Sequence, residues 1–226
     1  MPQAAGQHGD RGLRHRAGGV SDVLSDRFEP AIRDLYWKPW DAPGCEHVRV
    51  SLDPRRRASE AVVADGLVLL YRDGLALRCH YRLTADAQWR ARALDLVVQL
   101  GGPEPREAAL ALAGDGKGRW RVDGAHAPAL DGCLDLDIQV TPFTNTLPIR
   151  RLDLAAGEIA DLRAVYVPLP DLTPVPAEQS YACLRPLGLS GGLYHYESRA
   201  SGFSADLPVD SGGFVVDYPD SFRRIW

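Results

Sequence analysis

The sequence has almost no lysine, and its positive charge comes from arginine. Lys38 and Lys117 are the only lysines among the 226 residues. The 26 lysines and arginines are outnumbered by 30 aspartates and glutamates, so the formal net charge is −4. Proteins that bind nucleic acid need a basic face for the phosphate backbone. The composition therefore argues against nucleic acid as a partner.

Motifs for metals and other cofactors are also missing. The four cysteines lie far apart, without the Cys-x-x-Cys spacing of a zinc knuckle or a thioredoxin-type site. The histidines are dispersed, with no His-x-His or His-Glu-x-x-His. Residues 115–118 lack the Gly-Lys-Ser/Thr ending of a phosphate loop, and residues 189–192 lack the Gly-x-Ser-x-Gly of a nucleophile elbow. We expect no metal and no cofactor, and we interpret the cysteines as scattered, buried thiols.

Long apolar runs are absent as well. No stretch approaches the roughly 20 apolar residues that a membrane-spanning helix needs. Residues 1–19 include basic side chains, but no apolar core follows them, so we expect neither a secretory signal nor a membrane anchor. Free thiols without an export signal favour the cytoplasm. The sequence leaves the oligomeric state open.

Short stretches of alternating apolar and polar residues are what the sequence does contain. The clearest one, residues 75–83, places Leu, Leu, Cys, Tyr and Leu at every second position. Turn residues separate such stretches, and Asp65-Gly66 predicts a hairpin within residues 61–71. About a dozen short strands with little helical periodicity predict a mainly β protein, either an antiparallel incomplete barrel or a strongly curved sheet.

Residues 133–154 form the most distinctive segment. Leu134, Leu136, Ile138 and Val140 alternate with polar residues, which predicts a strand, and residues 141–146 then interrupt it as a loop because Pro142 cannot donate to a sheet. We expect extended chain again from Leu147. Continued alternation would place Arg150 on the apolar face with Leu152 and Leu154, and Arg151 on the other face.

The N-terminal part differs from the rest in composition. Residues 1–19 offer few side chains to bury, which predicts disorder. Residues 21–35 have an N-cap candidate at Ser21 and several apolar residues, but Pro30 would break a long helix. We therefore expect a disordered or loosely ordered extension over residues 1–36 and a single β domain over residues 37–226.

Several of these strings resemble a known family. The block at 132–152, the Trp-Arg-Ala-Arg at 89–92, the Gly-x-Trp at 118–120, the Gln-x-Tyr at 179–181 and the Val-Asp-Tyr-Pro at 216–219 are similar to bacterial proteins described as putative glycolipid-binding. The likeness runs in order from about residue 40 onwards. It implies a largely antiparallel incomplete barrel, similar to lipoprotein-localisation factors, that binds a lipid or glycolipid.

The leading hypothesis is therefore a carrier without catalytic activity. An apolar cavity would take acyl chains, while polar and arginine side chains at its mouth would hold a sugar or phosphate headgroup. The candidates for ligand binding are arginines on otherwise apolar faces, nearby aromatic rings and two strand aspartates. The candidate ligand-binding residues are Trp89, Arg90, Arg92, Trp120, Asp135, Asp137, Arg150, Tyr166, Tyr194 and Tyr196.

Other interpretations remain open at this point. Arg90 or Arg150 could pair with Asp135 or Asp137 in a structural network, because a buried cation needs a partner. A hydrolase of glycosides or esters could use Asp135 and Asp137, although carboxylates two apart on a strand, roughly 6.5–7 Å between Cα atoms, would flank a bond poorly. Exposed strand edges would also fit a scaffold or interaction protein.

Overall fold

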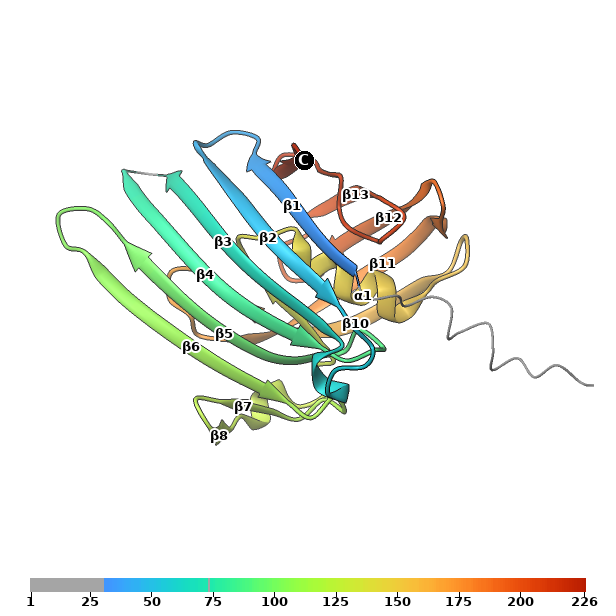
Figure 1. Ribbon diagram of the computed structural model, residues 1–226, viewed down its shortest axis with the longest axis horizontal. Helices are drawn as coiled ribbons and strands as arrows, with labels where there is room; N and C mark the ends of the chain where they lie inside the picture. Colours follow the sequence, from blue (N-terminus) through green and yellow to red (C-terminus); the bar gives the residue numbers. More distant parts are fainter. Residues whose placement is uncertain (1–30, 73) are drawn as a thin grey trace, which may run out of the picture.

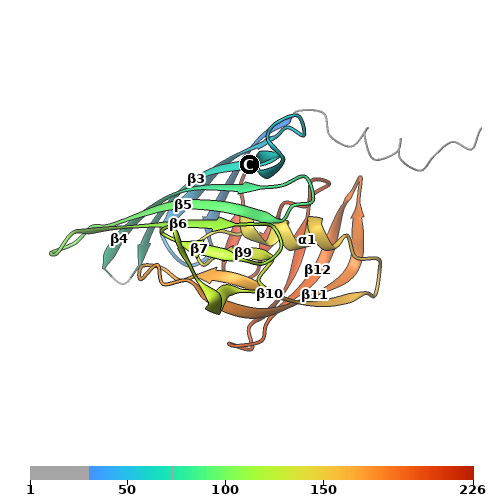
Figure 2. The same cartoon turned by 90° about the horizontal axis from the view of Figure 1, so that it is seen from below.

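The computed structural model describes residues 31–72 and 74–226, and most of their regular structure is β-strand. Two sheets lie one over the other (Figures 1 and 2). The expected mainly β class, with a large antiparallel sheet and a curved half-barrel, is confirmed. The described residues form fifteen strands rather than about a dozen.

The larger sheet has ten strands in the order β14-β15-β1-β2-β3-β4-β5-β6-β7-β8, and every neighbouring pair in it is antiparallel. Most of it is a meander in which strands adjacent in sequence are also neighbours in the sheet. The C-terminal hairpin adds the last two strands beside β1. The strands are β1 (Ala31–Pro39), β2 (Gly44–Leu52), β3 (Val62–Arg72), β4 (Leu75–Ala85), β5 (Ala91–Leu100), β6 (Arg106–Gly114), β7 (Trp120–Val122), β8 (Ala125–His126), β14 (Asp217–Tyr218) and β15 (Phe222–Arg224).

The smaller sheet has five strands in the order β13-β12-β11-β10-β9. Its pairs are antiparallel except β9–β10, which is parallel. One α-helix and three short 3₁₀ helices complete the described elements. The bounds are β9 (Asp135–Ile138), β10 (Ile159–Val167), β11 (Val175–Gly188), β12 (Gly191–Ser198), β13 (Ser204–Val209), η2 (Ala58–Glu60), η3 (Pro128–Leu130), η4 (Phe143–Asn145) and α1 (Thr146–Leu152).

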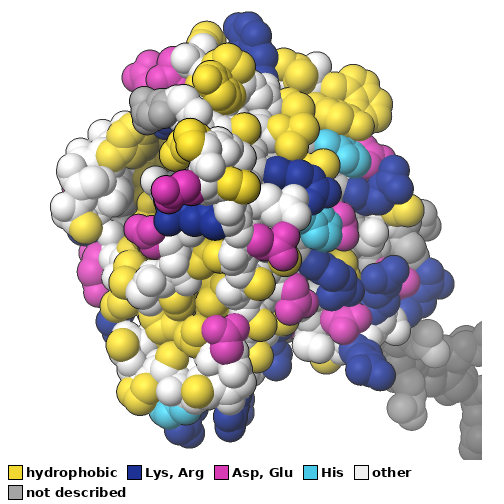
Figure 3. Space-filling view, turned by 90° about the vertical axis from the view of Figure 1, so that its left-hand side faces the viewer, with side chains coloured by type: hydrophobic (Ala, Val, Ile, Leu, Met, Phe, Trp, Pro, Cys, Tyr) yellow, Lys and Arg dark blue, Asp and Glu magenta, His cyan; other side chains and the backbone are white. Residues whose placement is uncertain are grey.

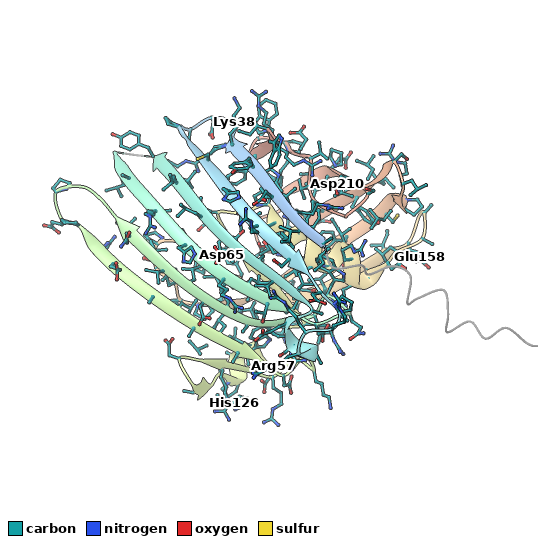
Figure 4. The ribbon with its side chains drawn as sticks, viewed as in Figure 1. Lys38, Arg57, Asp65, His126, Glu158 and Asp210 are labelled. Atoms are coloured by element: carbon teal, nitrogen blue, oxygen red, sulfur yellow. The ribbon has the colours of Figure 1, made fainter. Side chains whose placement is uncertain are left out.

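The strands of the larger sheet bury one face and expose the other, as their alternation predicts. In β4, Cys79 and Tyr81 are buried, whereas Arg78 and His80 are exposed. The outer face carries ion pairs, and His80 lies 3.3 Å from Asp65, which Figure 4 shows on β3. Charged and histidine side chains are interspersed over one side of the molecule in Figure 3. The inner face therefore builds the core, and the outer face meets solvent.

The predicted hairpin at Asp65-Gly66 is wrong, because both residues lie inside the continuous strand β3. Gly66 pairs with Tyr81 of β4, and the phenol ring lies across the glycine. A Cβ at position 66 would stand 2.2 Å from Cζ of Tyr81. The glycine thus marks a close approach of a ring to the backbone rather than a turn.

The segment after β9 is helical, so the prediction of extended chain from Leu147 is also wrong. Residues 143–152 form η4 and then α1, and Thr146 to Ile149 are buried. Pro148 is tolerated because backbone N–H groups in the first turn have no partner within the helix. The helix ends at Asp153, whose φ of 46° is left-handed. A short helix buried on nearly all sides leaves no 3.6-residue pattern to recognise.

The first described strand begins earlier than expected. Residues 31–36, assigned from the sequence to the loose extension, belong to β1 and pair with β2. The remainder of that extension, including Ser21 and Pro30, lies outside the described residues.

The core has two parts. The larger cluster lies on the inner face of the ten-stranded sheet, and the second packs α1 against the smaller sheet through residues such as Ile149, Tyr181 and Tyr194. Figure 2 shows the ends of β3 to β6 projecting past the smaller sheet. None of the helices described here has the length and hydrophobicity needed to cross a membrane.

Candidate ligand pocket

A pocket of about 710 Å³ is lined by strands of the smaller sheet and by the β14–β15 hairpin. It is larger than two other hollows, of about 500 and 410 Å³. The residues around it come from β9 and the turn that follows, from β10 to β12, and from the C-terminal hairpin. Segments far apart in the sequence therefore meet at this one place.

Asp137 supplies a fixed carboxylate in the wall of the pocket. Nε2 of Gln179 donates to its Oδ2 at 2.7 Å, and Oγ1 of Thr144 donates to its Oδ1 at 3.2 Å. Gln179 is itself buried, so the carboxylate is held in one orientation. Burial raises the pKa of Asp137, and the two hydrogen bonds offset part of that rise. A carboxylate has about four acceptor sites, so capacity remains for a ligand.

Aromatic side chains form much of the remaining wall. The ring centroid of Tyr196 lies 6.4 Å from that of Phe203 and 6.3 Å from that of Tyr218. Tyr166 lines the same pocket from β10. Burial raises the pKa values of the three tyrosines, and the carboxylate of Asp137 raises them further. The phenols therefore remain neutral hydrogen-bonding groups at physiological pH.

Charged residues at the pocket are engaged with one another. Glu178 lies 3.0 Å from Nε of Arg163. Arg199 pairs with Asp161 at 2.8 Å and with Glu197 at 3.1 Å. In these exposed pairs two arginines face three carboxylates, and Asp137 adds a fourth, so the pocket has no excess of positive charge.

The segment after β9 supports the pocket wall from behind. Asn145 accepts a hydrogen bond from the hydroxyl of buried Tyr181 at 2.7 Å and donates to the carbonyl of Pro142 at 3.3 Å. Oγ1 of Thr141 accepts the N–H of Phe143 at 3.0 Å. Thr141 and Asn145 also line the pocket. The local hydrogen bonds expected of residues 141–146 are present, and they are made within a helical turn.

Three of the ten residues predicted from the sequence meet in this pocket: Asp137, Tyr166 and Tyr196. Trp120 and Tyr194 are instead core residues. The indole N–H of Trp120 donates to the carbonyl of Cys133 at 2.8 Å, and the hydroxyl of Tyr194 accepts the N–H of Leu187 at 3.2 Å. Their aromatic rings serve packing rather than the pocket.

Four further candidates gather elsewhere, around the turn that precedes β5. Trp89 has a left-handed φ of 62° in that turn, and the guanidinium of Arg150 lies 5.1 Å from its ring centroid. Arg90 pairs with buried Asp86 at 2.8 Å, and Arg92 donates to the carbonyl of Gly114 at 3.1 Å. The cations are thus engaged by a buried carboxylate, a carbonyl and an aromatic face.

Asp135 forms an ion pair with Arg151 that ties β9 to α1. Nη2 and Nε of Arg151 lie 2.6 and 2.9 Å from the carboxylate oxygens, and Asp135 is only 1% exposed. Burial raises the pKa of Asp135, whereas Arg151 lowers it. The two strand aspartates therefore differ in role, since only Asp137 faces the pocket.

The pocket residues that sequence reasoning missed include Gln179, Tyr218, Asn145 and Phe203. Two of them lay within strings that carried the family resemblance, Gln179 in 179–181 and Tyr218 in 216–219. Asn145 was considered only as a loop residue. Phe203 stands in a Gly-Phe-Ser turn and has no signal of its own.

The described residues contain no group of three or more histidine, cysteine, aspartate or glutamate side chains arranged to hold a metal ion. The histidines of the larger sheet instead pair singly with aspartates, as His47 does with Asp34 at 2.8 Å.

The fold and the pocket define a two-layer β protein in which a ligand-sized hollow adjoins the smaller sheet. The chain belongs to the family described as putative glycolipid-binding, which matches residues 34–224, so the resemblance noted from the sequence is confirmed. It is similar to a solved DUF1089 family protein from Pseudomonas aeruginosa, with 38% identity and a TM-score of 0.66 over 82% of this chain and 95% of that one. No curated protein matches the chain.

Proposed function

We propose that the protein binds a lipid-linked sugar without transforming it, and that the pocket around Asp137 receives the sugar headgroup. The observation that carries this proposal is a carboxylate fixed by Gln179 and Thr144 in a wall that also carries five aromatic side chains. The family description points to the same class of ligand.

The chemistry of the wall suits a sugar. Sugar hydroxyls donate to carboxylates, and the apolar faces of a pyranose ring pack against aromatic side chains. Tyr196 and Tyr218 offer both a ring face and a neutral hydroxyl. Arg199, the arginine that lines the pocket, is already paired with two carboxylates, which favours an uncharged headgroup over a phosphate, because a phosphate would call for unengaged arginines.

One observation favours a glycoside hydrolase as a second candidate. Asp137 combines a raised pKa with a position in a pocket, which are the properties of a general acid. Glycoside cleavage requires a second carboxyl group as well. Glu178 lines the same pocket, but it is paired with Arg163. We therefore place binding ahead of catalysis.

Binding can be tested with purified protein and a panel of methyl and alkyl glycosides of common hexoses, together with native mass spectrometry of the protein as isolated. We expect at least one glycoside to bind and Asp137→Asn to weaken it by about 10- to 100-fold, because a hydrogen bond to a charged group contributes about 1.5–3 kcal/mol. Asp65→Asn, on the outer face of β3, is the matched control and leaves affinity unchanged.

Three outcomes decide between the candidates. A folded protein that binds no glycoside and retains no lipid overturns the binding proposal. Release of free sugar from the same glycosides, abolished by Asp137→Asn, replaces it with the hydrolase. Stoichiometric capture of one protein partner without lipid would support an interaction protein instead.

A further inference from the structure

A second, apolar pocket adjoins the first at the projecting end of the larger sheet. It has a volume of about 410 Å³ and lies between the inner face of β3 to β5 and the chain that follows β9 and β10. Figure 3, which faces the ends of these hairpins, shows a hollow with hydrophobic side chains around it. The side chains facing it include Leu70, Leu75, Leu77, Leu100, Val140 and Leu169.

The apolar lining follows from the sheet register. Leu70, Leu77 and Leu100 are directly paired across β3, β4 and β5, so they form one continuous row. The row lies on the same face as the core, because the residues two positions nearer the middle of each strand are buried. Beyond the smaller sheet nothing among the described elements covers this row completely, and Leu75 remains 41% exposed.

The two pockets share part of their walls. Gln139, Ser221 and Phe222 line both of them. Ser221 and Phe222 belong to the β14–β15 hairpin, and Phe222 packs against the larger core cluster while staying half-buried. The hairpin therefore stands as a thin partition between a polar, aromatic pocket and an aliphatic one.

Resting on the proposed function, we infer that the 410 Å³ pocket receives the alkyl chain of the same ligand whose sugar occupies the pocket around Asp137. An amphiphile that passes Phe222 would place each of its halves against side chains of matching chemistry. Three charged residues line the rim of the chain pocket: Arg72 and Asp41 pair with each other at 3.1 Å, and Asp220 belongs to the turn of the β14–β15 hairpin. The ligand class is thus a glycoside with an aliphatic chain rather than a free sugar.

The inference predicts a dependence on chain length. Burying one methylene contributes about 0.8 kcal/mol, which corresponds to about a fourfold gain in affinity. For n-alkyl β-D-glucosides from hexyl to decyl, measured by calorimetry below their micelle concentrations, the affinity should rise by about that factor for each methylene until the pocket is full. Methyl glucoside reports on the sugar pocket alone.

Two leucines provide a matched pair of variants. Leu69 and Leu75 are both 41% exposed and lie on the paired strands β3 and β4, but Leu69 points to the outer face and Leu75 lines the chain pocket. Leu75→Asn should lower affinity for decyl glucoside at least fivefold and change that for methyl glucoside less than twofold. Leu69→Asn should change neither.

The outcomes separate this inference from the proposed function. The chain pocket is overturned if affinity does not depend on chain length, or if Leu75→Asn leaves that dependence intact. The sugar pocket is tested separately, by the effect of Asp137→Asn on the affinity for methyl glucoside. If Leu75→Asn removes the dependence of affinity on chain length while Asp137→Asn leaves affinity unchanged, the chain pocket is supported and the sugar pocket is rejected. If decyl glucoside fails to bind the folded protein, the inference is rejected.

Discussion

Glu46 is a fully buried carboxyl group on the inner face of β2. The hydroxyl of Tyr81 donates to its Oε1 at 2.6 Å, and the same hydroxyl lies 3.3 Å from Oγ1 of Thr141, which lines the pocket around Asp137. Oε2 of Glu46 has no hydrogen-bond partner among the described residues. Burial raises the pKa of Glu46 from 4.5 to about 7, although the hydrogen bonds with Thr141 and Tyr81 oppose the rise.

This raised pKa predicts a loss of stability as the pH increases. The unfolded chain releases the Glu46 proton near pH 4.5 and the folded chain near pH 7, so stabilisation is complete below 4.5 and is lost as the pH rises to about 7. The loss should amount to roughly 3 kcal/mol. Urea unfolding across pH 4.5–8 should show a steeper decline in the wild type than in Glu46→Gln, which keeps the other buried carboxyl groups. If the free energy of unfolding changes with pH in the same way in both proteins, Glu46 does not have the raised pKa.

Asp135 and Asp137 show how far single residues could be interpreted from the sequence. Both stand on one strand with the same parity, and the sequence analysis named both as candidate ligand-binding residues. Their different roles depend on Arg151 and Gln179, which approach from α1 and β11. Because residues 147–152 alternate like a strand, the helix that delivers Arg151 could not be foreseen. A residue's role was predictable only where its neighbours on the strand determined it.

Among the elements, long strands with one buried face were predictable, and β9 was expected as a strand, but its burial on both faces was not. β2, β4, β5 and β6 follow the expected alternation closely. β9 pairs in parallel with β10 and buries Asp135 together with Leu136, so its polar positions are not solvent-facing. Tertiary contacts outweigh local pattern in such elements.

The contact between β3 and β4 at Gly66 yields a prediction about a single methyl group. Gly66→Ala would place a Cβ against the fully buried ring of Tyr81, which has no free space to move into, and should destabilise the protein by about 1–3 kcal/mol. Gly188→Ala is the control, since a Cβ there meets nothing within 4 Å. Urea midpoints should separate the two variants. Equal midpoints would show that the ring is not confined by β3.

In the molecule as a whole, the β14–β15 hairpin is held by far fewer contacts than the central strands. It joins the larger sheet through three residue pairs with β1, whereas β3 and β4 share eleven. Local opening is easiest where few hydrogen bonds must break. The partition between the two proposed pockets is therefore less firmly paired than the central strands of the larger sheet.

Hydrogen exchange followed by mass spectrometry tests this difference. Amides of residues 216–226 should exchange faster than those of residues 79–85 of β4, and decyl glucoside should slow the former without affecting the latter, because Tyr218 and Phe222 line the proposed binding pockets and residues 79–85 do not. If the amides of the hairpin are as well protected as those of β4 when no glucoside is present, the partition is not movable.

The pairing of β1 with β15 also has a consequence for biosynthesis. Trp37 and Arg224 are partners in the sheet although nearly the whole described sequence separates them. A nascent chain emerging from the ribosome can complete the meander from β1 to β6 early, but Tyr218 and Phe222 reach their places only after the rest has been translated. The two proposed pockets can therefore be completed only after strands β1 to β13 have been synthesised.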